Sequence, residues 1–173
     1  MRDRLNVDGV ASQAIKINSK FADAYHNRGL ARFALQDYQG AIQDYDKAID
    51  NSNNWAWAYF NHGLARAATD KHKDATSDFD RALEIDNNYI EAYYQRGVAR
   101  FNRKLYKDAI KDCDRVIQRD PNYAAAYENK GNSLLALKKK VEAKQAFEQA
   151  IEIYSQKQDT TNLQRVQQII AGI

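Results

Sequence analysis

The sequence predicts an all-α solenoid, in which helical hairpins stack into a right-handed superhelix. The first observation is a 34-residue period, at which glycine recurs as Gly29, Gly63, Gly97 and Gly131. The second is composition, because one proline and seven glycines among 173 residues favour helix. The third is that each period holds two amphipathic stretches with helical spacing. Neither stretch can bury its apolar face alone, so the units have to stack.

Other columns keep the same interval as the glycines. Small residues at fixed places are expected where two helices approach closely, because a larger side chain would hold the backbones apart. In residues 90–123, the apolar spacing predicts a first helix through Tyr93 and Phe101 and a second through Tyr106 and Ile117. The columns read Tyr25, Tyr59, Tyr93 and Tyr127; Ala24, Ala58, Ala92 and Ala126; and Ala41, Ala75, Ala109 and Ala143.

Composition and charge exclude several classes of protein. The chain has 26 Lys and Arg against 23 Asp and Glu, a formal net charge of +3, with both signs spread along it. This pattern offers no basic tail for nucleic acid. A single cysteine excludes an internal disulfide framework and a thiolate zinc site. Because the sequence shows neither a signal-peptide pattern nor an apolar run of about 20 residues, we expect no membrane insertion and a cytoplasmic location.

These columns resemble the tetratricopeptide repeat family. Its pattern has an aromatic residue at position 4, Gly at 8, Ala at 20, an aromatic at 24, Ala at 27 and Pro at 32. The resemblance covers four full units, 22–55, 56–89, 90–123 and 124–157. Two departures are visible. Only Pro121 supplies the terminal proline, and the position 24 column includes a cysteine, reading Tyr45, Phe79, Cys113 and Phe147.

The two ends complete a single predicted domain over residues 1–173. Residues 1–21 match the second half of a truncated repeat, with a helix over about 6–17 that lacks its own partner. The chain is therefore either a piece of a longer protein or one that self-associates through this open end. Residues 158–173 predict a capping helix whose apolar stripe is Leu163, Val166, Ile169, Ile170 and Ile173. Its opposite, solvent-facing side carries Gln164, Arg165, Gln167 and Gln168.

Charged residues form a second set of columns. Position 11 is Arg in three units and position 23 is Asp in the same three, while the fourth unit loses both charges. We therefore predict structural ion pairs between the two helices of a hairpin. The alternatives are that the Arg columns bind acidic or phosphorylated partners, or nucleic acid. The predicted pairs are Arg32 with Asp44, Arg66 with Asp78, and Arg100 with Asp112.

The family resemblance also nominates a concave groove, built from positions 2, 5, 6, 9 and 12 of the first helices. Position 6 is always an amide, which can both donate to and accept from a peptide main chain. Exposed aromatic rings beside it would anchor a partner's side chains. Alternatively, the amides bridge helices and the rings belong to the core. The candidate peptide-binding residues are His26, Asn27, Phe33, Trp57, Phe60, Asn61, Tyr94, Gln95, Phe101 and Asn129.

The co-chaperone members of the family clamp the C-terminal carboxylate of a heat-shock chaperone with Lys, Asn, Asn, Lys and Arg. In this chain only Asn61 fits that pattern, and Glu91 would repel a carboxylate, so we predict no such binding. His26, His62 and His72 show no metal-ligand spacing, and no nucleotide or nucleophile motif is present. We therefore expect a scaffold that binds a protein or peptide, without a cofactor, a metal or catalysis.

Overall fold

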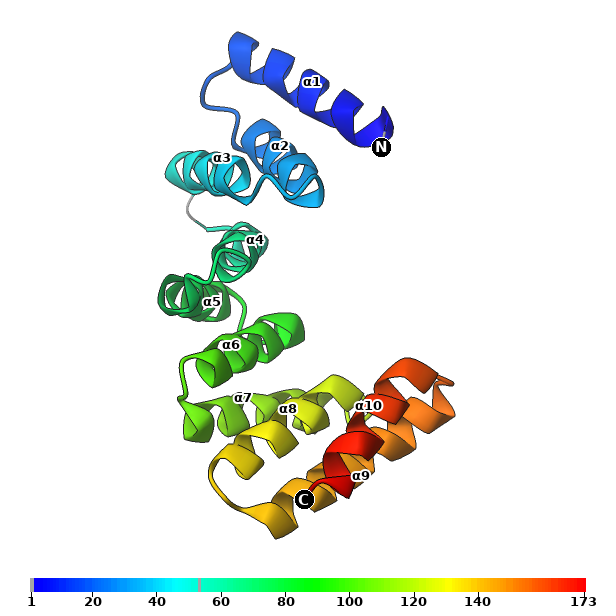
Figure 1. The fold of residues 1–173 in the computed structure, drawn as a ribbon. Helices are drawn as coiled ribbons and strands as arrows, with labels where there is room; N and C mark the ends of the chain where they lie inside the picture. The colour runs from blue at the N-terminus through cyan, green and yellow to red at the C-terminus, as the bar shows by residue number, and fades with distance from the viewer. Residues whose placement is uncertain (1, 53) are drawn as a thin grey trace. The chain divides into compact units, whose positions relative to one another are not determined.

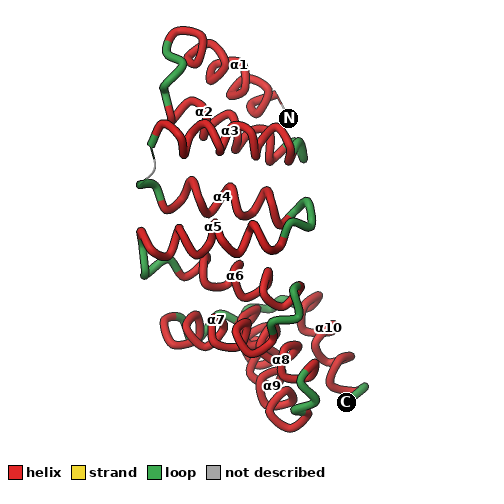
Figure 2. Tube along the Cα trace, turned by 90° about the vertical axis from the view of Figure 1, so that its left-hand side faces the viewer, coloured by secondary structure: helices red, strands yellow, loops and turns green. Residues whose placement is uncertain are grey.

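The computed structural model describes residues 2–52 and 54–173, with side chains from residue 9 onward. These residues form ten α-helices and no strand, which confirms the predicted all-α repeat fold (Figure 1 and Figure 2). They group into two compact units, Met1–Tyr89 and Ile90–Ile173. The boundary between the units falls where the second predicted repeat ends and the third begins.

The first unit contains α1 (Arg2–Ile17), α2 (Ala22–Ala34), α3 (Tyr38–Asn51), α4 (Ala56–Ala67) and α5 (His72–Ile85). Helices α2 and α3 form one hairpin and α4 and α5 the next, while α1 packs on α2 and α3 on α4 (Figure 2). Helix α1 begins at Arg2, earlier than the predicted start near residue 6. The polar residues before that point contain no helix breaker, so the helix continues through them.

The second unit contains α6 (Ile90–Asn102), α7 (Tyr106–Arg119), α8 (Ala124–Ala136), α9 (Lys140–Gln156) and α10 (Thr160–Ala171). Its hairpins are α6 with α7 and α8 with α9, and α10 packs on α9. The Asp159 carboxylate caps α10 by accepting a hydrogen bond from the Asn162 backbone N–H at 3.1 Å. The predicted apolar stripe of this helix packs against a buried cluster on α8 and α9, and Val166 is fully buried. A helix is therefore present where the sequence predicts the capping helix.

The two helices of a hairpin meet at the recurring glycine. A Cβ atom on Gly29 would lie 2.6 Å from the Tyr45 ring, and one on Gly131 would lie 2.6 Å from the Phe147 ring. Gly63 faces the Phe79 ring in the same way. These three rings are fully buried on the second helices. Each aromatic ring thus occupies the space that the absence of a side chain on the first helix leaves open.

The third repeat lacks this ring contact. Cys113 takes the place of the aromatic residue and is itself fully buried. A Cβ atom on Gly97 would meet the Asp112 Cβ at 3.3 Å, a contact that a small shift relieves. The thiol behaves as a small core group, because burial raises the pKa of Cys113 to about 12 and keeps it protonated at neutral pH.

The turns that join the two helices of the four hairpins have the same backbone conformation. One residue adopts a positive φ, and the next backbone N–H donates back to a carbonyl of the last helical turn, as Asp37 does to Arg32 at 2.9 Å. This is the arrangement that ends helices at a left-handed residue. Because the four hairpin turns are alike, each second helix starts at the same point relative to its glycine. The left-handed residues are Gln36, Asp70, Lys104 and Lys138.

The ring contacts predict different costs for the same substitution in one unit. We expect Gly131→Ala to lower the free energy of unfolding by about 2 kcal/mol, because the new methyl group overlaps the Phe147 ring. Gly97→Ala should change it by less than about 1 kcal/mol, since the helical preference of alanine offsets a mild contact. Urea unfolding followed by circular dichroism measures both. Equal losses in the two variants would contradict the proposed role of the ring.

Candidate functional site

In the first unit, the predicted groove residues lie on α2 and α4, the first helices of its two hairpins. Asn27 is exposed, whereas Phe33, Trp57, Phe60 and Asn61 are half-buried. Leu30 on α2 is 40% exposed, which is high for a leucine. This unit therefore offers solvent an amide-bearing and apolar surface on α2 and α4.

The rings of this surface are held by packing. Trp57 stacks on Trp55 with ring centroids 4.7 Å apart, and Phe60 contacts Phe79 and Tyr89 at 5.8 and 4.8 Å. Each ring thus has one side in the core and part of its surface in water. Such rings lose little conformational freedom when a partner covers them, which favours binding.

His26 differs from the sequence-based expectation. It is only 6% exposed, and its ring packs edge-on against Trp57 at 3.7 Å and tilted against Tyr45 at 5.5 Å. Burial lowers the pKa of His26 to about 4, so the imidazole is neutral at pH 7. His26 therefore packs against the Trp57 ring and has little exposed surface for contact with a ligand.

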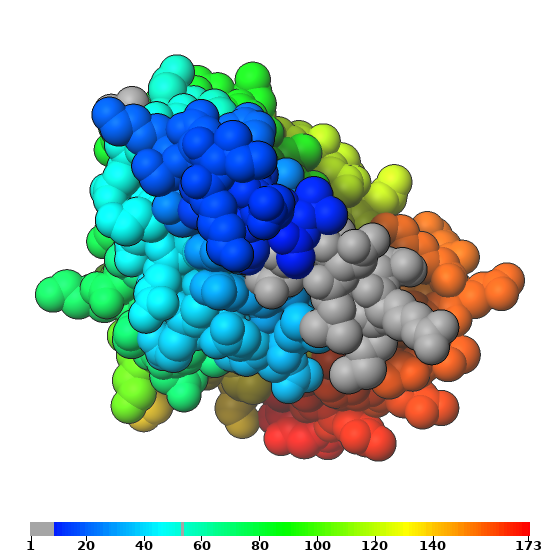
Figure 3. Space-filling view, turned by 90° about the horizontal axis from the view of Figure 1, so that it is seen from above, coloured from blue at the N-terminus to red at the C-terminus, as the bar shows by residue number. Residues whose placement is uncertain are grey.

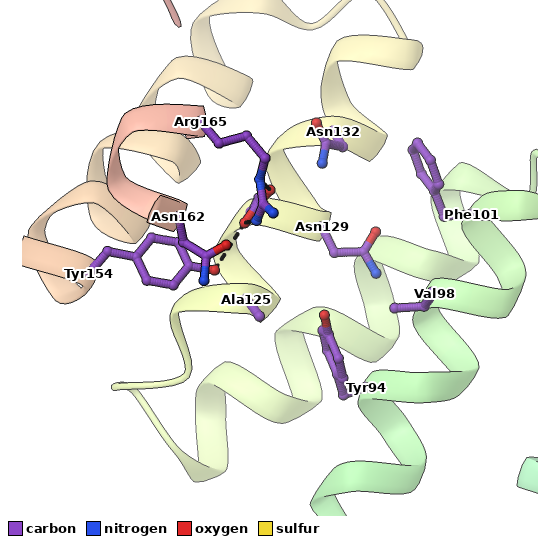
Figure 4. A pocket seen from close by; sticks show the side chains of 10 residues that line it. Tyr94, Val98, Phe101, Ala125, Asn129, Asn132, Tyr154, Asn162 and Arg165 are labelled. Carbon is purple, nitrogen blue, oxygen red and sulfur yellow. Dashed lines mark hydrogen bonds and ion pairs between the residues drawn. The ribbon is translucent and has the colours of Figure 1, made fainter. Parts of the chain in front are cut away.

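The second unit contains a pocket of about 380 Å³ among α6, α8 and α10, with one contribution from α9 (Figure 4). The pocket brings together Tyr94, Phe101 and Asn129 of the predicted site, while Gln95 lies on α6 outside the lining. Apolar groups line the α6 side, and amides and charged groups line the other sides. The remaining lining residues are Val98, Ala125, Glu128, Asn132, Tyr154, Asn162 and Arg165.

A buried acid forms one wall of this pocket. Glu128 on α8 is 8% exposed, and its carboxylate accepts hydrogen bonds from Arg165 Nε at 3.1 Å and Nη2 at 2.7 Å. The Tyr154 hydroxyl donates to the same carboxylate at 2.9 Å. Burial and the neighbouring Glu128 carboxylate together raise the pKa of Tyr154, so the phenol remains a donor.

Arg165 therefore does not face away from the fold, as its place on the polar side of the predicted capping helix implied. Its side chain reaches across from α10 to the Glu128 carboxylate, which would otherwise be a buried charge without a counterion. Glu128 lies at position 5, one of the predicted groove positions, but was not among the candidate residues, and Tyr154, Asn162 and Arg165 were missed. The signal in the sequence was an acidic residue at position 5 of the fourth unit, where the preceding units carry aromatic rings or histidine.

The amides of the pocket differ in how they are paired. The Asn162 side chain donates to Asp159 at 2.6 Å. Asn129 is 8% exposed, and its Nδ2 atom has no hydrogen-bond partner among the described residues. A buried amide that lacks a partner is costly, so it is a natural point for a ligand to satisfy.

Each predicted Arg–Asp pair lies within ion-pair distance in the structure. Arg32 lies 3.0 Å from Asp44, Arg66 lies 3.0 Å from Asp78, and Arg100 lies 2.8 Å from Asp112. The three carboxylates are nearly buried, with side chains 3 to 8% exposed. Where the fourth repeat loses both charges, Leu134 and Ala146 lie in one buried apolar cluster.

A second arginine column, considered from the sequence only for nucleic-acid binding, also pairs with these aspartates. Arg28 and Arg96, at position 7, donate from Nε and Nη2 to both oxygens of Asp44 and Asp112, with Nη2 distances of 2.6 Å. The second repeat has His62 at this place, 3.3 Å from both Asp46 and Asp78. The missed signal was an i, i+4 spacing of two arginines, which puts both on one helical face.

Among the residues that the structure describes, no group of three or more His, Cys, Asp or Glu side chains is arranged to hold a metal ion. Within the same residues, no helix combines the length and apolar character needed to cross a membrane.

The fold and the 34-residue period define a class of all-α helical-repeat protein. The chain belongs to the tetratricopeptide repeat family, because models of this repeat match residues 22–52, 58–89, 90–123 and 124–157. The matches follow the four units and together span most of the chain.

Similar proteins include the curated Xenopus tropicalis protein RNA polymerase II-associated protein 3, which is 51% identical over 37 residues. That match covers 21% of this chain and 6% of the relative, so it spans only a small part of the relative's length. The crystal structure of MamA is 22% identical, with a TM-score of 0.85, and the match covers 91% of this chain and 94% of that one.

The first tetratricopeptide domain of Spaghetti (RPAP3), bound to the HSP90 peptide SRMEEVD, is 29% identical to this chain. Its TM-score is 0.66, and the match covers 69% of this chain and 95% of that domain.

The ion pairs yield a testable stability prediction. Replacing Asp112 by Asn should lower the free energy of unfolding by about 3 kcal/mol, because two arginines lose their counterion in a largely buried place. Arg100→Ala should cost less, since Arg96 still holds the carboxylate. A double-mutant cycle on Arg100 and Asp112, measured by urea unfolding, should show a coupling of at least about 0.5 kcal/mol. A coupling near zero would show that the pair is not an energetic unit.

Proposed function

We propose that this protein is an interaction scaffold that binds a partner protein or an extended peptide with the side chains of its first helices. The observation that carries the proposal is the pocket of the second unit, where an amide without a partner, partly exposed rings and a hydrogen-bonded charge pair converge. Mixed pockets with a few fixed polar groups are typical of ligand sites. In the first unit, α2 and α4 carry partly exposed rings and amides, which form a separate candidate surface.

The RPAP3 domain with its HSP90 peptide supports peptide binding as the general activity. The same mode does not carry over to this chain residue by residue. At the positions of the chaperone clamp, this chain has His26, Leu30, Asn61, Glu91 and Gln95. None of these five is a cation at neutral pH: burial keeps His26 neutral, and Glu91 is an exposed acid. We therefore propose a partner other than a chaperone C-terminal carboxylate.

Nucleic-acid binding is less well supported. Phosphate binding requires arginines whose charge is available to the backbone of the nucleic acid. Here the arginines of both columns lie against Asp44, Asp78 and Asp112. Members of the tetratricopeptide repeat family are typically non-enzymatic scaffolds, and we propose the same for this chain.

Self-association is the second candidate function. Val10 and Ile17 on α1 are 65% and 81% exposed, which is unusual for apolar side chains of this size. Figure 3 shows the part of α1 drawn in blue, with no other described helix of the first unit in front of it. A second copy of the chain could cover these side chains, and the mass in solution distinguishes a dimer from a monomer.

A pull-down with a matched pair of variants tests the proposed function. The site variant is Phe60→Ala/Asn61→Ala/Tyr94→Ala, and the control is Lys47→Ala/Ser77→Ala/Arg115→Ala on exposed positions of the second helices. We expect wild type and control to retain the same protein and the site variant to lose it, because only the site variant removes first-helix contacts. Circular dichroism checks that each variant is folded.

Equal retention by the site variant would contradict the proposal and move binding to another face. Loss in the control alone would place the partner on the second helices. If wild type retains nothing, a measured dimer mass would favour self-association as the function.

A further inference from the structure

The pocket of the second unit is electrically balanced. Its lining contains one acid and one base, Glu128 and Arg165, and they are bound to each other through two hydrogen bonds. The Tyr154 hydroxyl donates a third hydrogen bond to the same carboxylate. A charged ligand group that entered the pocket would lose water without finding an uncompensated counterion. That loss is unfavourable for a carboxylate and for an ammonium alike.

The pocket nevertheless contains a buried polar group without a hydrogen-bond partner among the described residues. The Asn129 amide nitrogen is buried and has no partner among the described residues. Asn132 lies one helical turn further along α8, so a second amide faces the same space (Figure 4). An amide presents both donors and an acceptor, so these two groups together match a ligand that also presents both.

The α6 side of the pocket suits a short apolar stem. Tyr94, Val98 and Phe101 line it and are half-buried, so their surfaces can cover methylene groups (Figure 4). Burial raises the pKa of Tyr94 to about 12, so its hydroxyl is neutral and can donate at pH 7. The pocket thus combines an apolar side with a neutral polar side.

We propose that this pocket takes the carboxamide side chain of a glutamine or asparagine of the partner, in preference to a carboxylate or an ammonium. The proposal rests on the proposed function, because the side chain belongs to the bound peptide. The Asn129 amide, whose nitrogen is enclosed in the unbound structure, turns to donate to the carboxamide oxygen. The carboxamide NH2 group donates to the Asn132 side-chain oxygen, and the methylene groups lie against the α6 side chains. Glu128 and Arg165 set the specificity by cancelling each other's charge.

Matched peptides test the ligand class. An array of octapeptides with acetylated and amidated ends carries Gln, Glu or Lys at a fixed central position, with varied flanks. Blocked ends remove any terminal carboxylate. For the flanking sequences that give the tightest binding, fluorescence anisotropy measures the Kd of the Gln, Glu and Lys peptides separately. We expect the Gln peptide to bind at least about tenfold more tightly than its Glu and Lys counterparts.

Charge variants make the test specific for the pocket. Glu128→Gln leaves Arg165 uncompensated, so the preference should shift from Gln to Glu. Arg165→Gln leaves Glu128 uncompensated, so it should shift to Lys. The double variant Glu128→Gln/Arg165→Gln restores neutrality and should restore the preference for Gln. A purely structural role of the pair would weaken all three peptides together and leave their order unchanged.

Three results overturn the inference. Wild type could prefer Glu or Lys, the order of the peptides could stay fixed in all variants, or no array peptide could bind although the pull-down retains a partner. In each of these cases the proposed function stands and only the pocket assignment fails. The proposed function fails separately, if the pull-down shows the same partner retained by the first-helix variant.

Discussion

The close approach of the two helices in each hairpin is the contact on which the other features depend. A glycine on the first helix lets the ring of Tyr45, Phe79 or Phe147 on the second lie against its backbone. The ring is fully buried there, which fixes the rotation of both helices about their axes. Position 5 of the first helix contacts this ring in the first two hairpins, through His26 and Phe60. Phe33, Asn61 and Phe101, at positions 12, 6 and 12, are among the partly exposed side chains of the two candidate surfaces.

Buried charge is the second constraint. In the first three repeats, an aspartate beside the ring or cysteine forms an ion pair with arginine from the first helix, and in the second repeat His62 also lies beside it. The fourth repeat has no such aspartate and fills the place with Leu134 and Ala146. Its buried acid is Glu128, on the pocket side of α8, and its counterion comes from α10. In the fourth repeat the ion pair is therefore Glu128 with Arg165 in the wall of the pocket, and not an Arg–Asp pair inside the hairpin. At that place the pair can influence which ligand binds.

The sequence alone predicts most of the fold, because the features that build it are local and periodic. Glycine, ring and alanine columns identify the hairpins, and the paired loss of charge in the fourth unit identifies the partners of Arg32, Arg66 and Arg100. The pocket was harder to predict, because Glu128 and Arg165 are far apart in the sequence, Glu128 departs from the pattern of its column, and Arg165 lies outside the four repeats. The burial of His26 was missed for a related reason, since it depends on Trp57 of the next repeat. Where α1 begins was also missed, because helix ends carry weak local signals.

Site-specific photocrosslinking tests most directly whether partners bind to the first-helix surface of the second unit. Benzoylphenylalanine replaces Phe101, which lines the pocket, or Tyr93, which lies on the same helix beside Arg96 and Arg100 on a different surface. Both variants carry the same probe on α6, so they differ only in the direction that the probe faces. The account predicts that irradiation in cells joins a partner to the Phe101 variant and leaves the Tyr93 variant free. A partner joined to the Tyr93 variant alone would contradict it.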